Sequence, residues 1–446
     1  MYSEMGRIHM AAGKNRTKTG VFSDAFLCTG GTLFAFLVLW SLWSFITPSP
    51  IFSRGFSNSV SGVVAGRGCF GGSGQGFDLT DDPPAKTFYD DPDFGYTIDK
   101  PVKNWDEKRR EWLKQHPSFI PGSENRILVV TGSQATPCKN KIGDHLLLRL
   151  FKNKVDYCRI HGHDIFYNTV LLHPKMFSFW AKVPAVRAAM MAHPESEWIW
   201  WVDSDAAFTD MDFKLPLDRY KDHNMVVHGW QDQIEKRSWT SVNAGVFLIR
   251  NSQWALDFMD VWAKMGPQSP EYDRWGETQR KTFKDKSFRE SDDQSGLIYL
   301  ILKEQEKWGN KIYVESEFYF EGYWLEIVGK LDNITDMYLG VEKTARELRR
   351  RHAEKVSESY GRKWEAHLKD AGYGRSGWRR PFITHFTGCQ PCSGDHNQMY
   401  SGETCGEAMH KALNFADNQV LRNYGFMHRD LMDTATVVPV PRDFPA

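Results

Sequence analysis

The chain has 446 residues, a net charge of +0 and an aromatic content of 14%, including 17 tryptophans. This length exceeds the usual single hydrophobic core, so we expect one large domain or two small ones. The balanced charge excludes the basic surface of a nucleic-acid-binding protein, and the aromatic content suits surfaces that stack on sugar rings as well as a large core.

An uncharged apolar segment near the N-terminus, Ala25–Ile46, predicts a membrane-spanning helix. Its length matches the ~20 residues that cross a hydrocarbon core of ~30 Å. Four basic residues precede it: Arg7, Lys14, Arg16 and Lys18. The positive-inside rule then leaves residues 1–24 in the cytosol and the rest of the chain in the lumen. A cleaved signal peptide is the alternative, but the segment is long for one and no small-residue cleavage site closely follows it.

Residues 47–100 predict a stem between the membrane and a folded head. The first part, residues 47–76, is rich in Gly and Ser and has no periodicity, which is typical of a flexible linker. The acidic segment 78–100 leads into the head. We therefore expect a folded domain over residues 101–435 and a C-terminal tail over residues 436–446.

The head opens with alternating strand and helix patterns. The expected elements are a strand over 127–130, a helix over 144–161, a strand over 165–167 and a helix over 185–192. Gly162 stops the first helix, Pro184 suits the first turn of the second, and Pro194 ends it. This order is that of a Rossmann-like half, so the expected fold class is α/β.

The next apolar run, Trp198–Val202, ends in two carboxylates, Asp203 and Asp205, with Ser204 between them. A buried parallel strand needs no polar alternation, and open α/β sheets bind ligands beyond the carboxyl ends of such strands. Two hard oxygen ligands suit Mg²⁺ or Mn²⁺, which keep open positions for the phosphates of a substrate. Aspartates are also common in turns and caps after strands, so this pair alone does not decide the matter.

Five segments of the chain together resemble glycosyltransferase family 34, the plant xyloglucan xylosyltransferases and galactomannan galactosyltransferases. The segments are Trp198–Trp230, Asn140–Gly162, Asn243–Asn251, Ser291–Leu297 and His385–Gly394. The resemblance extends over residues 100–430 or so. It implies a GT-A type fold, a UDP-sugar donor, a polysaccharide acceptor and a single-pass type II protein of the Golgi membrane.

The resemblance also implies a third metal ligand, His385, which completes the site of Asp203 and Asp205. A lone histidine is usually structural, and only the resemblance favours ligation here. Because an imidazole suits Mn²⁺ better than Mg²⁺, we expect Mn²⁺ as the cofactor. Gly388, which follows closely, permits contact between the backbone and phosphates.

Several residues are expected to contact the nucleotide sugar, either beside the first strand or by family resemblance. They are Thr131, Gly132, Asp156, Tyr157, Ser204, Asn243 and Gly388. Asn243 offers both a donor and an acceptor to sugar hydroxyls. Each of these residues also fits an ordinary helix, loop or strand entry.

The segment Ser291–Gln294 stands immediately before an apolar helix, Ser295–Ile301. Capping of this helix by Asp293 explains one carboxylate without catalysis. The resemblance instead places Asp293 and Gln294 at the anomeric carbon, with Asp292 beside them.

The family retains the anomeric configuration, and two routes give that outcome. A two-step route requires Asp293 as the nucleophile. In the one-step, same-face route the leaving phosphate takes the proton of the acceptor, while Asp293 and Gln294 orient the sugar and stabilise oxocarbenium-like charge. We favour the one-step route.

Residue 390 bears on the donor sugar. Family members that transfer xylose to β-1,4-glucan commonly carry Lys here, in a His-Phe-x-x-Cys-Lys-Pro-Cys pattern, whereas this chain has Gln390. With Cys392–His396, this resembles the galactomannan galactosyltransferases, so we expect galactose transfer from UDP-galactose to O-6 of mannose in β-1,4-mannan. Xylose transfer from UDP-xylose to β-1,4-glucan and a catalytically silent Golgi subunit are the alternatives. Without that Lys, another cation must balance the phosphate charge.

Seven cysteines occur, and Cys28 lies in the predicted membrane span. The other six are Cys69, Cys138, Cys158, Cys389, Cys392 and Cys405. An even number in an oxidising lumen predicts disulfides of undetermined pairing. A single Cys-x-x-Cys pattern, Cys389–Cys392, argues against a zinc site or a redox pair.

Two further patterns lie between residues 330 and 370. Asn333-Ile334-Thr335 is a glycosylation sequon on the lumenal side of the predicted anchor. The charged run 342–370 predicts solvated helices without chemistry.

Overall fold

The computed structural model describes residues 94–348, 357–371, 379–397 and 399–441, together with Phe88 and Asp91. The chain divides into two units, Met1–Gly76 and Phe77–Ala446, and every described residue belongs to the second. The cytosolic tail, the predicted membrane span and the Gly/Ser-rich part of the stem therefore lie outside the described residues. Among the helices that are described, none has the length and apolar character needed to cross a membrane.

A six-stranded mixed sheet with the order β2-β1-β3-β6-β5-β7 forms the centre of the domain. Its strands are β1 (Ile127–Gly132), β2 (Asp164–Asn168), β3 (Trp198–Val202), β5 (Met225–Gly229), β6 (Val242–Arg250) and β7 (Ile312–Glu315). Strand β6 runs antiparallel to its neighbours β3 and β5, and all other pairs are parallel. The expected α/β class and the first three strands are confirmed. The reversal of β6 was not predicted.

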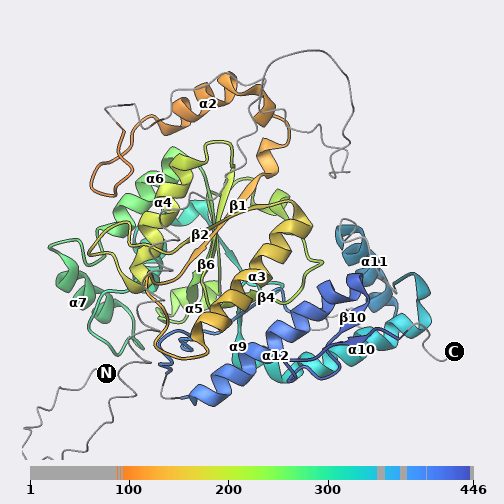
Figure 1. Ribbon diagram of the computed structural model, residues 1–446. Helices are drawn as coiled ribbons and strands as arrows, with labels where there is room; N and C mark the ends of the chain where they lie inside the picture. Colours follow the sequence, from red (N-terminus) through yellow and green to blue (C-terminus); the bar gives the residue numbers. More distant parts are fainter. Residues whose placement is uncertain are drawn as a thin grey trace, which may run out of the picture. The chain divides into compact units, whose positions relative to one another are not determined.

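Helices cover both faces of this sheet (Figure 1). Alternate residues of β1 and β3 face two different cores, as the two-residue period of a strand requires. One face packs against α4 (Lys182–Ala192), α6 (Gln253–Ala263) and α8 (Asp293–Lys303). The other packs against α3 (Gly143–His161), which ends at Gly162 in the left-handed conformation, as predicted. Three further helices are α2 (Trp105–Gln115), α5 (Gln231–Glu235) and α7 (Tyr272–Thr282).

A smaller sheet with the order β4-β9-β8 joins the central sheet to the C-terminal helices. Its strands are β4 (Ala206–Phe208), β8 (Gly322–Tyr323) and β9 (Ile383–His385). The helices are α9 (Trp324–Ile327), α10 (Leu331–Thr344), α11 (Ser357–Asp370) and α12 (Gly402–Leu421). The charged run 342–370 is not only a solvated surface, because Trp364 and Leu368 of α11 are buried in a core with α10 and α12.

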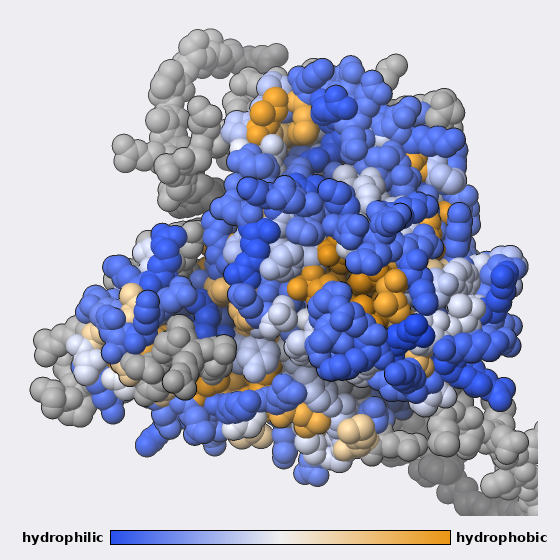
Figure 2. All heavy atoms as spheres, turned by 180° about the vertical axis from the view of Figure 1, so that it is seen from behind, coloured by the Kyte–Doolittle hydropathy of each residue, from blue (hydrophilic) through white to orange (hydrophobic). Residues whose placement is uncertain are grey.

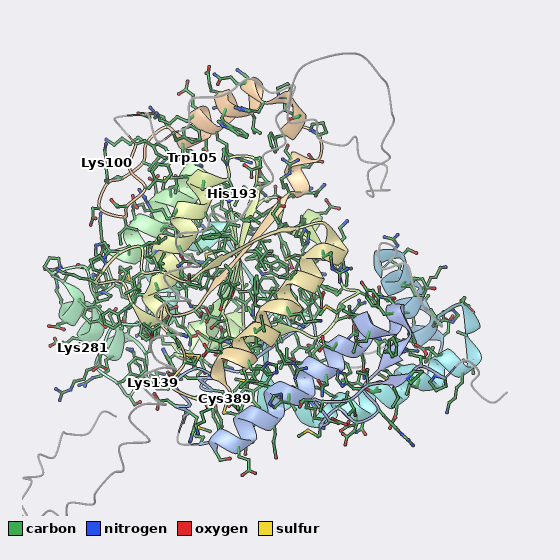
Figure 3. All side chains as sticks on the ribbon, in the orientation of Figure 1. Lys100, Trp105, Lys139, His193, Lys281 and Cys389 are labelled. Atoms are coloured by element: carbon green, nitrogen blue, oxygen red, sulfur yellow. A yellow bond between two sulfur atoms is a disulfide. The ribbon has the colours of Figure 1, made fainter. Side chains whose placement is uncertain are left out.

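The compact domain extends beyond both predicted boundaries. Phe94 and Ile98, which were assigned to the stem, are buried in the same core as Trp105. Trp105 lies at the start of α2 (Figure 3). The Trp105 indole also donates to Oδ1 of Asn251 at 2.8 Å. At the other end, β11 (Val438–Pro439) pairs with β10 (Phe426–Met427), so the predicted tail is partly structured.

The face of the described domain that is opposite to the view of Figure 1 is largely hydrophilic (Figure 2). Seen from behind, apolar side chains gather in a few patches within a largely polar face (Figure 2). Single exposed apolar residues are normal on soluble domains. A large aromatic residue that is exposed near functional groups, in contrast, indicates a binding surface.

Candidate active site

Asp203, Asp205 and His385 come together where β3, β4 and β9 meet. Their ligand atoms all lie within 4.8 Å of one another. The two aspartates occupy the turn between β3 and β4, and the pairing of Ala206 with His385 brings β9 alongside. Nε2 of His385 lies 3.3 Å from Oδ1 of Asp205 and 3.8 Å from Oδ2 of Asp203. The three residues predicted to bind metal thus form one cluster.

Glu321 holds the imidazole of His385 in this orientation. Its Oε1 lies 3.0 Å from Nδ1 of His385, and both side chains are buried. Nδ1–H can thus donate to the Glu321 carboxylate, which directs Nε2 toward the two aspartates, and a bound metal ion would replace the proton on Nε2, as in many carboxylate–histidine–metal arrangements. Sequence reasoning missed Glu321, because no motif surrounds it.

Two further observations fit the cluster to a divalent cation. A Cβ atom at Gly245 would lie 2.3 Å from Cε1 of His385 and 2.7 Å from Oδ2 of Asp203, so only glycine leaves room for these ligands. Burial lowers the pKa of His385, but Asp205 and Glu321 outweigh burial and raise the pKa to about 10. The carboxylates thus favour positive charge here, which a divalent ion provides.

A buried lysine, Lys182 in the first turn of α4, connects this cluster to Asp293. Its Nζ lies 2.7 Å from Oδ2 of Asp293 and 3.4 Å from Oδ1 of Asp203, and it donates to the Ala244 carbonyl at 2.9 Å. Burial lowers the pKa of Lys182, but Asp203 and Asp293 raise it to about 12. Lys182 is therefore a charged cation within the site. The only sequence signal for it was a lysine two residues before Pro184, inside an otherwise apolar helix.

Asp292 and Asp293 have different surroundings. Asp292, and not Asp293, caps α8, because the helix begins at Asp293, two residues earlier than expected, and Ser295 N donates to Oδ1 of Asp292 at 2.8 Å. Asp292 also forms an ion pair with Lys286. These contacts give Asp292 a structural role, and its catalytic role stays a prediction. Asp293 instead faces Lys182, and burial raises its pKa to about 6 even though Lys182 lowers it.

Gln294 and Asn243 form the adjoining wall between α8 and β6. Nε2 of Gln294 donates to the Trp239 carbonyl at 2.9 Å, and its Oε1 accepts from Ala244 N at 3.3 Å. Oδ1 of Asn243 accepts from Gly245 N at 2.7 Å. The structure therefore brings both predicted amides to the end of β6 that adjoins Asp203.

Known proteins are similar to this chain in sequence. The profile of the galactosyl transferase GMA12/MNN10 family, glycosyltransferase family 34, matches residues 123–396. The chain belongs to this family. It is 59% identical to putative glycosyltransferase 7 of Arabidopsis thaliana over 97% of this chain and 95% of that protein.

Two relatives have names that state a substrate. Galactomannan galactosyltransferase 1 of Cyamopsis tetragonoloba is 58% identical over 93% of this chain and 95% of that protein. Xyloglucan 6-xylosyltransferase 1 of Arabidopsis thaliana is 43% identical over 75% of this chain and 66% of that protein. The chain is thus a glycosyltransferase, and a GT-A type fold stays what the family resemblance implies.

In this glycosyltransferase, Thr131 and Gly132 end β1 beside the metal cluster. The pairing of Val130 with Trp201 puts these two residues level with the end of β3. The Thr131 hydroxyl is buried and makes no hydrogen bond to any described residue. A Cβ atom at Gly132 would lie 2.3 Å from the Asn168 carbonyl oxygen, so β2 is also close. Contact of Thr131 and Gly132 with the nucleotide stays a prediction.

Asp156 and Tyr157 of α3 do not join them, which corrects the prediction. Tyr157 is fully buried and stacked on Phe208 at a centroid distance of 3.9 Å, and its hydroxyl donates to the Phe213 carbonyl at 2.8 Å. Asp156 forms ion pairs with Lys152 and Arg159 of the same helix. The helical pattern of this segment did not reveal that this face of α3 packs against β4.

Ser204, between the metal-cluster aspartates, is half-buried, and its carbonyl accepts from Nζ of Lys154 at 3.2 Å. This contact holds the turn against α3. A role of the Ser204 side chain toward the donor stays a prediction.

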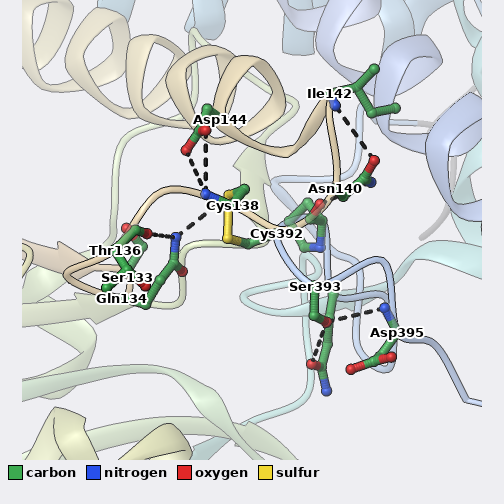
Figure 4. Close-up of a disulfide and its surroundings, with 12 residues drawn as sticks. Ser133, Gln134, Thr136, Cys138, Asn140, Ile142, Asp144, Cys392, Ser393 and Asp395 are labelled. Atoms are coloured by element: carbon green, nitrogen blue, oxygen red, sulfur yellow. Dashed lines mark hydrogen bonds between the residues drawn. A yellow bond between two sulfur atoms is a disulfide. The ribbon is translucent and has the colours of Figure 1, made fainter. Parts of the chain in front are cut away.

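The loop after β9 is cross-linked on two sides. The disulfide Cys389–Cys405 joins it to the first turn of α12, and Cys138–Cys392 joins it to the loop after β1 (Figure 4). Gly388 has a φ of 84°, which favours glycine. The exposed Gln390 accepts from Ser393 Oγ at 3.0 Å.

These disulfides confirm the predicted bonding for four cysteines. Cys389 and Cys392 bond to different partners, so they are not a redox pair. Cys158 is buried without a disulfide in the described part of the chain, and Cys69 lies outside it. Burial raises the pKa of the Cys158 thiol, which keeps it protonated and unreactive.

Asn333 is exposed in the first turn of α10. The Thr335 hydroxyl donates to the Leu331 carbonyl at 2.9 Å. The sequon is thus on the surface, and its glycosylation stays a prediction.

Proposed function

We propose that this glycosyltransferase moves galactose from UDP-galactose to O-6 of mannose in β-1,4-mannan, with retention of configuration. The observation that carries the proposal is the 58% identity to a galactomannan galactosyltransferase over 95% of that protein. Gln390, where xylosyltransferases commonly carry Lys, points to the same branch.

Mn²⁺ is the proposed cofactor, held by Asp203, Asp205 and His385. Two carboxylates with one imidazole suit Mn²⁺ better than Mg²⁺. When bound, the ion supplies Lewis-acid assistance to the departure of UDP. Lys182 keeps a positive charge beside Asp203 and Asp293 and balances part of their negative charge.

Asp293 and Gln294 are proposed to orient the donor sugar in the one-step, same-face route. The Asp293 carboxylate is buried and paired with Lys182 at 2.7 Å. An ion pair of this kind lowers the nucleophilicity that a two-step route demands of a carboxylate, whereas it leaves a fixed negative charge that stabilises an oxocarbenium-like sugar. The amide of Gln294 completes this wall.

The second candidate is xylose transfer from UDP-xylose to β-1,4-glucan. The observation that favours it is the 43% identity to xyloglucan 6-xylosyltransferase 1. A silent polysaccharide-binding subunit fits less well, because the metal cluster and Asp293 are intact.

The location proposed for the enzyme is the Golgi membrane, with residues 25–46 as a type II anchor and a glycan at Asn333. Its support is the apolar segment, the positive residues before it and the sequon. The two disulfides of the head suit an oxidising compartment.

One experiment tests the donor and the acceptor together. The detergent-solubilised full chain is incubated with UDP-galactose or UDP-xylose and with mannohexaose or cellohexaose. Galactose lost from the nucleotide should appear on mannohexaose. Some xylose should also transfer, because rejecting the smaller sugar forfeits only ~1–3 kcal/mol of contacts. Xylose transfer to cellohexaose, with no galactose incorporated anywhere, contradicts the proposal.

A further inference from the structure

Trp230 is a large aromatic residue that the fold leaves exposed on the same edge of the sheet as the metal cluster. Its side chain is 46% exposed, although its backbone is held on both sides. Trp230 N donates to the Ser241 carbonyl at 2.9 Å, and the Trp230 carbonyl accepts from Gln233 N at 3.0 Å. The exposed ring is thus anchored on ordered backbone.

The strand before Trp230 brings this backbone close to β6. A Cβ atom at Gly229 would lie 2.4 Å from the Ser241 carbonyl oxygen, so glycine allows the close approach. The register between β5 and β6 also shifts between Val227 and His228, and such bulges re-aim side chains next to active sites. The His228 ring then meets the Trp230 ring edge-on, with 4.9 Å between centroids. The His228 ring therefore supports one side of the indole, while 46% of Trp230 remains exposed to solvent.

Trp230 and the metal cluster share one edge of the sheet. His228 pairs with Asn243, and Asp203 N donates to the Gly245 carbonyl at 2.9 Å. Strands β5 and β3 are separated only by β6, which is a distance of about 10 Å between their axes. A chain of sugars bound at the cluster therefore reaches Trp230 within a few rings.

The order of the strands along this edge indicates which part of the substrate lies near Trp230. Thr131 and Gly132 lie on the β1 side of Asp203, where the nucleotide is expected. Asp293 and Gln294 lie against β6, where the donor sugar is expected. The β5 side then remains for the acceptor, which must approach the donor sugar from a direction that the nucleotide does not occupy.

We propose that Trp230 is a stacking platform for the acceptor polysaccharide. The apolar face of a pyranose ring packs on an exposed indole, which is large, rigid and amphipathic. The inference rests on the proposed function only in its need for a glycan acceptor; β-1,4-mannan and β-1,4-glucan chains both present such faces. Trp230 contributes binding to the acceptor and does not touch the reacting bond.

The test separates acceptor binding from donor chemistry in the full-length enzyme. Trp230→Ala, Trp230→Phe and the control Phe426→Ala are compared; Phe426 is 44% exposed and lies in β10 of the C-terminal part. Three quantities are measured: KM for the oligosaccharide, KM for the UDP-sugar during hydrolysis without acceptor, and retardation in gels that contain soluble galactomannan or glucan. Circular dichroism and melting temperature report folding.

Trp230→Ala should raise the acceptor KM by about tenfold, the equivalent of one modest contact, and change the donor KM far less. Gel retardation should fall, Trp230→Phe should recover much of both effects, and Phe426→Ala should behave as wild type. Equal changes in donor and acceptor KM, or an unchanged acceptor KM in folded Trp230→Ala, overturn the inference. An altered oligomeric state with an unchanged acceptor KM also overturns it and makes Trp230 a contact between copies.

The two proposals fail in distinguishable ways. If the wild-type enzyme transfers only xylose to cellohexaose, the galactosyl assignment fails while Trp230 is still scored on cellohexaose. If galactose reaches mannohexaose equally well with and without the Trp230 ring, the platform fails while the galactosyl assignment stands.

Discussion

The two halves of the metal cluster are held in place by different physics. Asp203 and Asp205 follow β3, whose five residues are all buried between two layers of helices. His385 ends β9, a three-residue strand in the small sheet, and the loop that follows it is tied by two disulfides. Packing thus positions the carboxylates, whereas cross-links and the hydrogen bond to Glu321 position the imidazole. Such a site can be weakened from either side independently.

The largest expected effect comes from the cluster itself, where both halves meet. Asp205→Ala should reduce transfer by about 1000-fold, because Lewis-acid assistance is worth several kcal/mol and each tenfold costs about 1.4 kcal/mol. Chelation should abolish transfer in the wild type, and Mn²⁺ should restore it. The exposed Asp222→Ala serves as the control, and full activity of folded Asp205→Ala contradicts the metal assignment.

A substitution at Trp200 tests the packing that positions the carboxylates. Trp200 is fully buried in β3 and lies edge-on against Phe208 and Tyr157. Trp200→Ala should lower the free energy of unfolding by about 3–5 kcal/mol. Denaturant titration measures the loss, and exposed Trp230→Ala should show little of it. A loss below about 1 kcal/mol shows that the sheet does not depend on this ring.

A substitution at Cys405 tests the disulfide that holds the loop after His385. Cys405→Ser opens the 16-residue link to Cys389, and a loop of that size should cost about 3 kcal/mol. The affinity for Mn²⁺, measured by electron paramagnetic resonance, should also weaken, because the His385 loop gains freedom. Cys158→Ala, which removes a thiol without a disulfide, should bind Mn²⁺ as wild type does. Undiminished Mn²⁺ binding by Cys405→Ser means that the strand alone positions His385.

The smallest effect sharpens the role of Glu321. Glu321→Ala should weaken Mn²⁺ binding by about 10–100-fold, as loss of an orienting partner does. Glu321→Gln keeps an acceptor for Nδ1–H and should lose less. The readout is the same Mn²⁺ titration, so that folding and catalysis do not enter. Equal losses in both variants show that charge, and not orientation, is what Glu321 contributes.

The sequence predicted local features better than long-range ones. The strands before residue 203, the helix of α3 and the aspartate pair were predicted because each is contiguous and its pattern is strong. Lys182 and Glu321 were missed because they act through partners that are 21 and 64 residues away in the sequence, Asp203 and His385 respectively. Local sequence patterns contain no information about contacts between residues so far apart in the sequence.

The predictions failed where one local sequence pattern was compatible with two structures. An acidic pair before a helix did not tell which residue caps it, and the structure selects Asp292 over Asp293. The helix around Tyr157 did not tell which face it buries. The reversal of β6 was hidden because a fully buried strand has the same pattern in either direction.

The disulfide Cys138–Cys392 closes a span of 254 residues, and this has a consequence for biosynthesis. A ribosome needs roughly 13–50 s to extend the chain over that span at ~5–20 residues per second. The sheet strands and Asp203 leave the ribosome early, whereas the loop beside His385 can form its disulfides only near the end of synthesis. Nascent chains of this enzyme should therefore acquire their metal site last, after most of the fold exists.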